Sequence, residues 1–315
     1  MKTKKPLFRL AALAALSFFT GNEIVAQTNI GAACGCPSYA TRPVASITTA
    51  GTWTNLPAAA YGKELLGNQN VTLTCDKTWT LDEKLYVGPG STLTIQPGTV
   101  IKGNVAQSTA AATALIIERG GKIMAAGTES CPIVFTANAD PMDGTYSVAT
   151  IGSWGGVVLL GKATNNLVAA NLPQTFGSKV GMGVGLGLIE GFNNTGSQNR
   201  YGVLQSGSVA DETIGTFDDN DNSGVMKFVS IRHTGAILEV GAEINGLTLG
   251  SVGRGTTIEH IEIVSGADDQ IELFGGTVNM KYVSSLFGND DMLDYDHGYS
   301  GKIQFFFGMK NDGTA

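Results

Sequence analysis

The sequence repeats itself near its C-terminal end at a short interval of about 22 residues, a period typical of stacked repeat folds. The segment SGADDQIELFGG at 265–276 is followed by FGNDDMLDYDHG at 287–298, in which the paired aspartates, the apolar positions and a closing glycine return. Units this short cannot each bury an apolar face, so they stack as coils that share one continuous core. The interval therefore predicts a solenoid.

The strands that precede the acidic turn align at the same interval. The aligned positions are Ile261, Val283 and Phe305 in one row, and Ile263, Ser285 and Phe307 in the next. The turn itself returns as Asn311 and Asp312. The sequence stops shortly afterwards, in the middle of a coil, so we expect the last coil to be incomplete.

Composition supports β structure. The chain has 43 glycines and only 15% charged residues, against roughly 25% in a typical globular protein. Valine, isoleucine, threonine and aromatic residues alternate between clusters of glycine, asparagine and aspartate, and helical periodicity is absent after the N-terminus. We therefore expect an all-β fold with frequent turns.

Two early coils show the same construction. Segment 85–99 aligns, with one gap, with segment 115–128, and each joins two short strands through glycine turns. Glycine supplies the positive φ that such corners need. Periodicity is lost at about 161–223, a length typical of a functional or disordered loop. The predicted organisation is a cap or extension at 27–66 and a solenoid at 67–315 with this loop inserted as a candidate binding surface.

The N-terminus has the pattern of a secretory signal. Basic residues at 2, 4, 5 and 9 precede an apolar run at 10–19 that is too short to span a bilayer, and a cleavage site fits after Ala26. We predict a signal peptide at 1–26 and a protein that is secreted or held at the cell surface, outside the outer membrane. No later stretch is apolar for long enough to form a transmembrane helix.

Four cysteines occur in this exported chain, at Cys34, Cys36, Cys75 and Cys131. An oxidising compartment favours disulfides over metal binding, and three pairings are possible. Cys34 and Cys36 are separated by a single residue, which argues against a bond between them. We therefore expect at least one disulfide that ties the N-terminal segment to the first coils.

The charge balance argues against nucleic acid as a partner. The net charge is −7, and no cluster of lysine and arginine follows the signal region, whereas phosphate binding needs a basic surface. The three histidines are His233, His260 and His297, and the repeat aligns His260 with Tyr282. Convergence of the three on one metal is therefore not expected.

Several segments together resemble one known group of proteins. They are LTIQPGTVIKG at 93–103, ERGGKI at 118–123, SWGG at 153–156, EINGLTLG at 243–250 and FGGT at 274–277. They are similar to exported bacterial right-handed parallel β-helix proteins of the pectin-lyase-like kind, a group of uncharacterised surface proteins and type IX secretion cargo. The resemblance implies a right-handed parallel β-helix, here with coils of about 22 residues. It implies no catalytic residues.

Acidic residues of successive coils should form a ladder along one edge, because neighbouring coils lie about 4.8 Å apart. The ladder consists of Asp268, Asp269, Glu272, Asp290, Asp291, Asp294 and Asp296. Three explanations stay open: aspartates that cap their own turns, calcium bound by carboxylate oxygens, and paired carboxylates for glycoside hydrolysis. The first is favoured, because asparagine or glycine replaces aspartate at equivalent positions.

The catalytic explanation has one further observation in its favour. Asp296, His297 and Gly298 follow the second pair of aspartates, and pectin-cleaving hydrolases on similar solenoids also combine paired aspartates with a Gly-His-Gly. The spacing here differs from theirs, and no Arg-x-Lys follows. The candidate catalytic residues on this explanation are Asp268, Asp269, Asp290, Asp291 and His297.

A second acidic stretch resembles the first half of a calcium loop. Asp219, Asp221 and Ser223 offer oxygens at alternate positions before Gly224, but the twelfth position, where an acidic residue is expected, is Ser230. These three residues are the candidate metal ligands, with calcium as the ion. The alternative is a solvated turn that leads into a strand.

Two functions are compatible with these features. The favoured one is an exported, non-enzymatic surface or adhesive solenoid that presents its coil faces and the inserted loop to a glycan or a surface protein. The alternative is a polysaccharide lyase or glycoside hydrolase that acts at an acidic groove. An enzyme needs two carboxylates roughly 5 to 9.5 Å apart in a cleft, whereas a scaffold needs only a regular ladder of turns.

Overall fold

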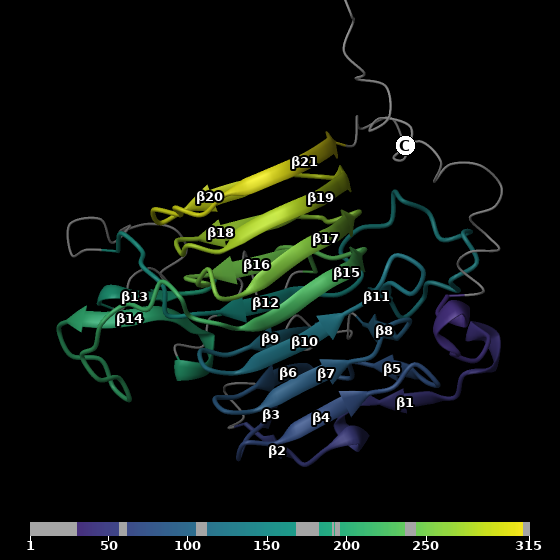
Figure 1. Ribbon diagram of the computed structural model, residues 1–315, viewed down its shortest axis with the longest axis horizontal. Coiled ribbons are helices and arrows are strands. Elements are labelled where there is room, and N and C mark those ends of the chain that lie inside the picture. The colour runs from purple at the N-terminus through teal and green to yellow at the C-terminus, as the bar shows by residue number, and fades with distance from the viewer. Residues whose placement is uncertain are drawn as a thin grey trace, which may run out of the picture.

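The computed structural model describes residues 30–56, 62–104, 112–167, 183–190, 192, 196–236 and 244–310. The predicted signal peptide and the Asn311-Asp312 turn lie outside this range. In the described part of the chain almost all regular structure is strand, and two large sheets wind around a common axis as a right-handed parallel β-helix (Figure 1). The predicted fold class is confirmed.

Sheet A has eleven strands. In spatial order the first eight are β1 (Val44–Ser46), β5 (Thr78–Thr80), β8 (Val100–Gly103), β11 (Ile133–Ala137), β15 (Gly224–Arg232), β10 (Lys122–Ala126), β7 (Thr92–Ile95) and β4 (Asn70–Leu73). The remaining three are β17 (Thr257–Val264), β19 (Asn279–Gly288) and β21 (Ile303–Lys310). One half of β15 pairs with β10 and the other half with β11. Two columns of short strands therefore merge at β15 into one long strand per coil.

Sheet B has eight strands that close each coil on its other side. They are β2 (Trp53–Asn55), β3 (Lys63–Leu65), β6 (Lys84–Val87), β9 (Ala114–Ile117), β12 (Val157–Leu160), β16 (Leu247–Gly250), β18 (Ile271–Phe274) and β20 (Asp294–Asp296). All neighbours in it are parallel except β2 and β3. Four short 3-10 helices are described as well: η2 (Ala32–Cys34), η3 (Tyr39–Thr41), η4 (Ile47–Ala50) and η5 (Ser197–Asn199).

The strand pairing that the 22-residue interval predicts is correct between β17 and β19 and wrong between β19 and β21. Ile261 pairs with Val283, as the interval of the repeat requires, but Val283 then pairs with Phe306. The extra residue lies between β20 and β21, and a shift of one residue moves every side chain to the opposite face of a strand. Phe306 therefore packs against the core, whereas Phe305 and Phe307 are 58% and 53% exposed.

The core is a column of apolar side chains along the axis. In sheet B, Leu85, Leu115, Val157, Leu247 and Ile271 pair in register in five successive coils, and each is fully buried. Burying one such side chain contributes roughly 1.5 to 3 kcal/mol relative to exposure. This repeated burial explains why coils this short are stable only in a stack.

Two disulfides attach the N-terminal segment to the solenoid. Cys34 is bonded to Cys131 and Cys36 to Cys75. Arg42 of the same segment donates hydrogen bonds to the carbonyl groups of Pro37, Gly98 and Ile30. The expected link between this segment and the first coils is confirmed, and Cys34 does not pair with Cys36.

The described parts of the insertion at 161–223 contain regular structure, which the sequence did not indicate. Strands β13 (Val184–Leu188) and β14 (Arg200–Ser206) form an antiparallel pair at one side of the solenoid (Figure 1). Side chains of the insertion pack on the outer face of sheet B in a second buried apolar cluster that includes Tyr201, Phe192, Tyr86 and Ile116. The sequence did not predict these strands, because the glycines at 185 and 187 interrupt the alternation of apolar and polar side chains that is typical of a strand.

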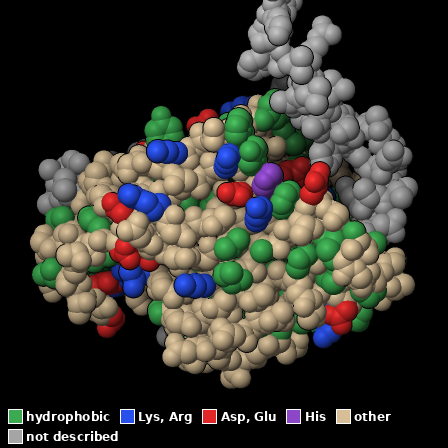
Figure 2. Space-filling model, viewed as in Figure 1, with side chains coloured by type: hydrophobic (Ala, Val, Ile, Leu, Met, Phe, Trp, Pro, Cys, Tyr) green, Lys and Arg blue, Asp and Glu red, His purple; other side chains and the backbone are tan. Residues whose placement is uncertain are grey.

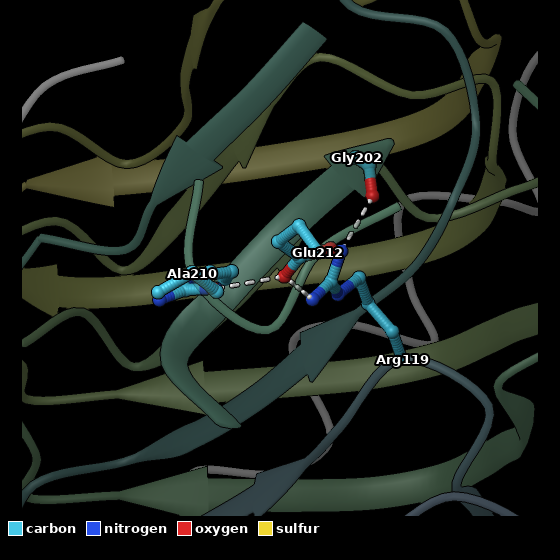
Figure 3. Close-up of polar contacts among 5 residues, drawn as sticks. Arg119, Gly202, Ala210 and Glu212 are labelled. Carbon is cyan, nitrogen blue, oxygen red and sulfur yellow. Dashed lines mark hydrogen bonds and ion pairs between the residues drawn. The ribbon is translucent and has the colours of Figure 1, made fainter. Parts of the chain in front are cut away.

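A charged cluster holds the insertion to an early coil (Figure 3). Arg119, which follows β9, donates hydrogen bonds to both carboxylate oxygens of Glu212 and to the carbonyl of Gly202. Arg200 adds a hydrogen bond of 3.1 Å to the same carboxylate and one of 2.9 Å to the carbonyl of Ala210. Glu212 therefore joins two arginines from distant parts of the chain.

Candidate functional site

The acidic residues of the last coils gather in the turns that lead into β18 and β20 and on these two strands of sheet B. We call Asp268, Asp269, Glu272, Asp290, Asp291 and Asp294 the acidic ridge. Carboxylate oxygens of Asp268, Asp269 and Asp290 lie within 4.8 Å of one another. Those of Asp269, Glu272 and Asp294 do so as well. Asp269 therefore belongs to both groups. Glu272 and Asp294 come together because β18 and β20 pair them directly.

Part of the ridge links the turns of neighbouring coils. Oδ1 of Asp269 accepts a hydrogen bond of 2.9 Å from the backbone amide of Asp291, one coil further on. The side-chain amide of Asn289 donates to the carbonyl of Ala267, again between neighbouring coils. These contacts give Asp269 and Asn289 a structural role between coils, which differs from the predicted capping of their own turns.

Two carboxyl groups of the ridge have pKa values well above the usual range. Burial, followed by the charges of Glu190, Asp269 and Asp294, raises the pKa of Glu272 to about 10. Burial and then the neighbouring aspartates raise the pKa of Asp269 to about 7, against a hydrogen bond from Asp291 that lowers it. Glu272 is 4% exposed, and the side-chain amide of Asn245 donates a hydrogen bond to it.

His297 does not join the aspartates of the candidate catalytic set. It follows β20, whereas Asp290 and Asp291 precede that strand, so the two lie at opposite ends of it. Nδ1 of His297 is hydrogen-bonded to the hydroxyl of Tyr201 in the insertion, at 2.6 Å. Burial lowers the pKa of His297, so the ring is neutral near pH 7. The sequence placed Glu272 in the same ladder as the aspartates but not among the candidate catalytic residues, and it gave no sign that Glu272 is buried.

The candidate metal residues lie at the junction between the insertion and β15. The carboxylate of Asp219 accepts a hydrogen bond from the amide of Thr164 and lies 3.4 Å from the guanidinium of Arg254. These contacts hold its pKa below the usual range, the bond to Thr164 being the largest cause. Burial raises the pKa of Asp221, and Ser223 is 1% exposed. Asp219 is therefore engaged with the protein, and the backbone of Lys162 and the side chain of Ser223 contact the partly buried Asp221.

A row of aromatic side chains crosses the outer face of sheet A, and we call it the aromatic ladder. It consists of Phe228, His260, Tyr282 and Phe305, one from each of the last four long strands. Each has a positive φ, between 49° and 61°, which bends its strand at a corner. The rings stack in nearly parallel planes, with centroids 4.2, 4.6 and 4.9 Å apart along the row.

A groove of about 330 Å³ lies beside the ladder, on the half of β17, β19 and β21 that precedes the corner. Its lining residues are Arg254, Thr256, Thr257, Ile258, Glu259, Asn279, Met280, Lys281, Lys302 and Gln304. Figure 2 shows this face of the molecule, where apolar, basic and acidic side chains surround a histidine. The alignment of His260 with Tyr282 was the one feature of the sequence that pointed to the aromatic ladder. The positive φ at these corner residues cannot be recognised from spacing alone.

Comparison with known proteins agrees with this architecture. No curated protein and no solved structure matches the chain. Residues 66–315 match the family model described as a pectate-lyase-like β-helix domain. This range includes all the coils after β3, the acidic ridge, the aromatic ladder and the insertion. The chain therefore belongs to the pectate-lyase-like β-helix family.

Proposed function

We propose that the protein is an exported surface or adhesive module that binds a glycan along the acidic ridge without cleaving it. The β-helix family is compatible with binding polysaccharides or acting on them. Two disulfides support export, because such bonds persist in oxidising compartments. Among the described residues no helix has the length and apolar character needed to cross a bilayer.

The observation that carries this proposal is the regular spacing of the ridge. Asp268 and Asp269 recur one coil later as Asp290 and Asp291, and the coils are joined as parallel strands, which lie about 4.8 Å apart. Carboxylates accept hydrogen bonds from hydroxyl groups, so the ridge offers acceptors at a constant repeat. A polysaccharide presents hydroxyl groups at a constant repeat too. Asp290 and Asp291 are exposed and accessible to such a chain.

A binding assay with a panel of neutral polysaccharides tests the proposal. The purified protein is compared with an Asp290→Asn/Asp291→Asn variant and with an Asp82→Asn/Glu129→Gln control, which removes two exposed charges from distant coils. We expect saturable binding to at least one polysaccharide, weakened about tenfold in the ridge variant and unchanged in the control, with no release of fragments. Binding that is equal in all three proteins would contradict the proposal.

One observation favours the alternative, a polysaccharide-cleaving enzyme at the same ridge. Asp269, whose pKa is raised to about 7, lies beside Glu272, whose pKa is raised to about 10, and beside Asp294. Acid-base catalysis uses a protonated carboxyl next to an ionised one. If the panel releases fragments, and Asp269→Asn abolishes this release while binding persists, the enzymatic alternative replaces the binding module.

A further inference from the structure

We propose that a cavity at the corner between the two sheets binds a small monocarboxylate, such as propionate, with Lys102 as its counter-charge. The cavity lies at the carboxyl ends of β5, β8 and β11, in coils that precede the insertion, whereas the acidic ridge belongs to the last coils. The inference goes beyond the proposed function, because it stands on different residues and would hold if the ridge bound nothing.

The corner cavity is small, with a volume of about 170 Å³. Its lining residues are Thr80, Leu81, Asp82, Lys102, Asn104, Thr113 and Asn138. Three of them, Leu81, Lys102 and Thr113, are buried, whereas the two asparagines and the aspartate are exposed and form a polar rim. One water needs roughly 10 to 15 Å³, and sites for drug-sized ligands have roughly 300 to 1,000 Å³. The cavity therefore suits a ligand of a few heavy atoms.

Lys102 brings a buried positive charge to the cavity. It is 8% exposed, and its Nζ donates a hydrogen bond of 3.4 Å to the carbonyl of Asn138 and another to the carbonyl of Asp140. An ammonium group has three N–H donors, and the described residues provide hydrogen-bond acceptors for two of them. A buried charge is costly unless it is paired and fully hydrogen-bonded. An anion in the cavity would supply both the missing acceptor and the opposite charge.

The protein itself does not neutralise this charge. None of the described carboxylates forms an ion pair with Lys102. The carboxylate of Asp140 accepts hydrogen bonds from the hydroxyl of Thr136 at 2.6 Å and from the amide of Met142 at 2.8 Å. Asp82 is exposed at the rim, where water and salt screen its charge. The charge of Lys102 is therefore available to a ligand.

The lining favours a singly charged ligand. Lys102 is the one cation among the lining residues, so a sulfate or a phosphate dianion would bring a second negative charge that nothing in the cavity balances. A monocarboxylate matches a single lysine. The exposed side-chain amides of Asn104 and Asn138 can donate hydrogen bonds to carboxylate oxygens. The class of ligand follows from this combination of one cation and neutral donors.

The wall of the cavity is fixed before a ligand arrives. The hydroxyl of Thr113 accepts a hydrogen bond of 2.7 Å from the amide of Asn104 and donates one of 3.0 Å to the carbonyl of the same residue. The amide of Leu81 donates a hydrogen bond of 2.8 Å to the carbonyl of Lys102, in the neighbouring coil. Binding therefore has little additional structure to order, which lowers its entropic cost.

Calorimetric titration of the intact protein at constant ionic strength tests the inference. The probes are propionate, propionamide and propylamine, which have similar sizes and carry a negative charge, no charge and a positive charge. We expect propionate to bind at one site per chain with a dissociation constant on the order of 1 mM. The amide and the amine should bind at least tenfold more weakly.

Variants identify the site. Lys102→Met removes the charge but keeps a long side chain, so the affinity for propionate should fall at least tenfold. Asn104→Ala/Asn138→Ala changes only exposed rim side chains and should weaken binding about threefold. Lys122→Met and Asn70→Ala are the matched controls, because both side chains are exposed on other strands, and both should bind propionate normally. Circular dichroism checks that each variant is folded, and if Lys102→Met does not fold, the rim variant decides.

Four results would overturn the inference. The first is the absence of propionate binding at concentrations far above the expected dissociation constant. The second is equal affinity for propionate and propionamide. The third is undiminished binding in the folded Lys102→Met variant or, where that variant does not fold, in the rim variant. The fourth is tighter binding of inorganic phosphate or of a uronic acid than of propionate, which would identify a different class of ligand.

Discussion

Replacing Glu272 by glutamine should make the protein more stable at neutral and alkaline pH. Glu272 is 4% exposed and lies among other acidic groups, and its pKa is raised to about 10 from the usual 4.5. Below pH 4.5 its carboxyl is protonated both in the folded and in the unfolded chain, so it costs nothing. As the pH rises, the unfolded chain ionises first, and folding stability is lost until the folded carboxyl also ionises near pH 10.

The size of the effect follows from this difference. Each pH unit above 4.5 costs at most about 1.4 kcal/mol, which gives an upper limit of about 5 kcal/mol at pH 8. Local rearrangement and entry of water reduce such penalties, so we expect Glu272→Gln to add about 2 kcal/mol at pH 8 and almost nothing at pH 4. Glutamine also keeps an oxygen that can accept the hydrogen bond from Asn245.

Urea unfolding monitored by circular dichroism at pH 4, 6 and 8 measures this effect. The midpoint of Glu272→Gln should exceed that of the unmodified protein by an amount that grows with pH. Asp290→Asn is the matched control, because Asp290 is exposed in the same ridge and should give a smaller change. A shift that is the same at all three pH values, or that reverses at pH 8, would refute the reasoning.

Three further changes test the architecture. Glu212→Gln leaves Arg119 without its charged partner and should cost about 3 kcal/mol, so limited proteolysis should cut the insertion at 161–223 faster. Cys36→Ser/Cys75→Ser opens a disulfide between residues 39 positions apart and should lower stability by about 4 kcal/mol, seen as a lower thermal midpoint in the absence of reducing agent. Phe135→Ala removes a fully buried ring that stacks on Trp154 and should cost about 3 to 5 kcal/mol in urea unfolding. Unchanged proteolysis, an unchanged thermal midpoint and an unchanged urea midpoint, respectively, would contradict the three expectations.

The fold was predictable because a solenoid repeats its signal in every coil. Ile261 and Val283 occupy one row of the core, and their spacing alone placed β17 beside β19. The same reasoning failed at Phe305, because one additional residue in an irregular turn shifts the next strand by one position. Turn length is a local property, which the average interval cannot supply.

The candidate sites were less predictable because they depend on side chains brought together across coils. Asp269 and Asp291 could be placed at one edge, but the burial of Glu272 depends on what covers the outer face of sheet B. The insertion provides much of that cover, and its strands have few β-branched residues. The groove beside Lys281 depends on a corner at Tyr282 with positive φ, a conformation that few aromatic residues adopt.

Hydrogen exchange with and without a bound neutral polysaccharide tests the proposed function most directly. The proposal predicts slower exchange of backbone amides at 268–272 and 290–294 when the polysaccharide is bound, with little change at 183–190 and 196–206 in the insertion. Slower exchange confined to the insertion, or no change in the ridge at saturating polysaccharide, would contradict it.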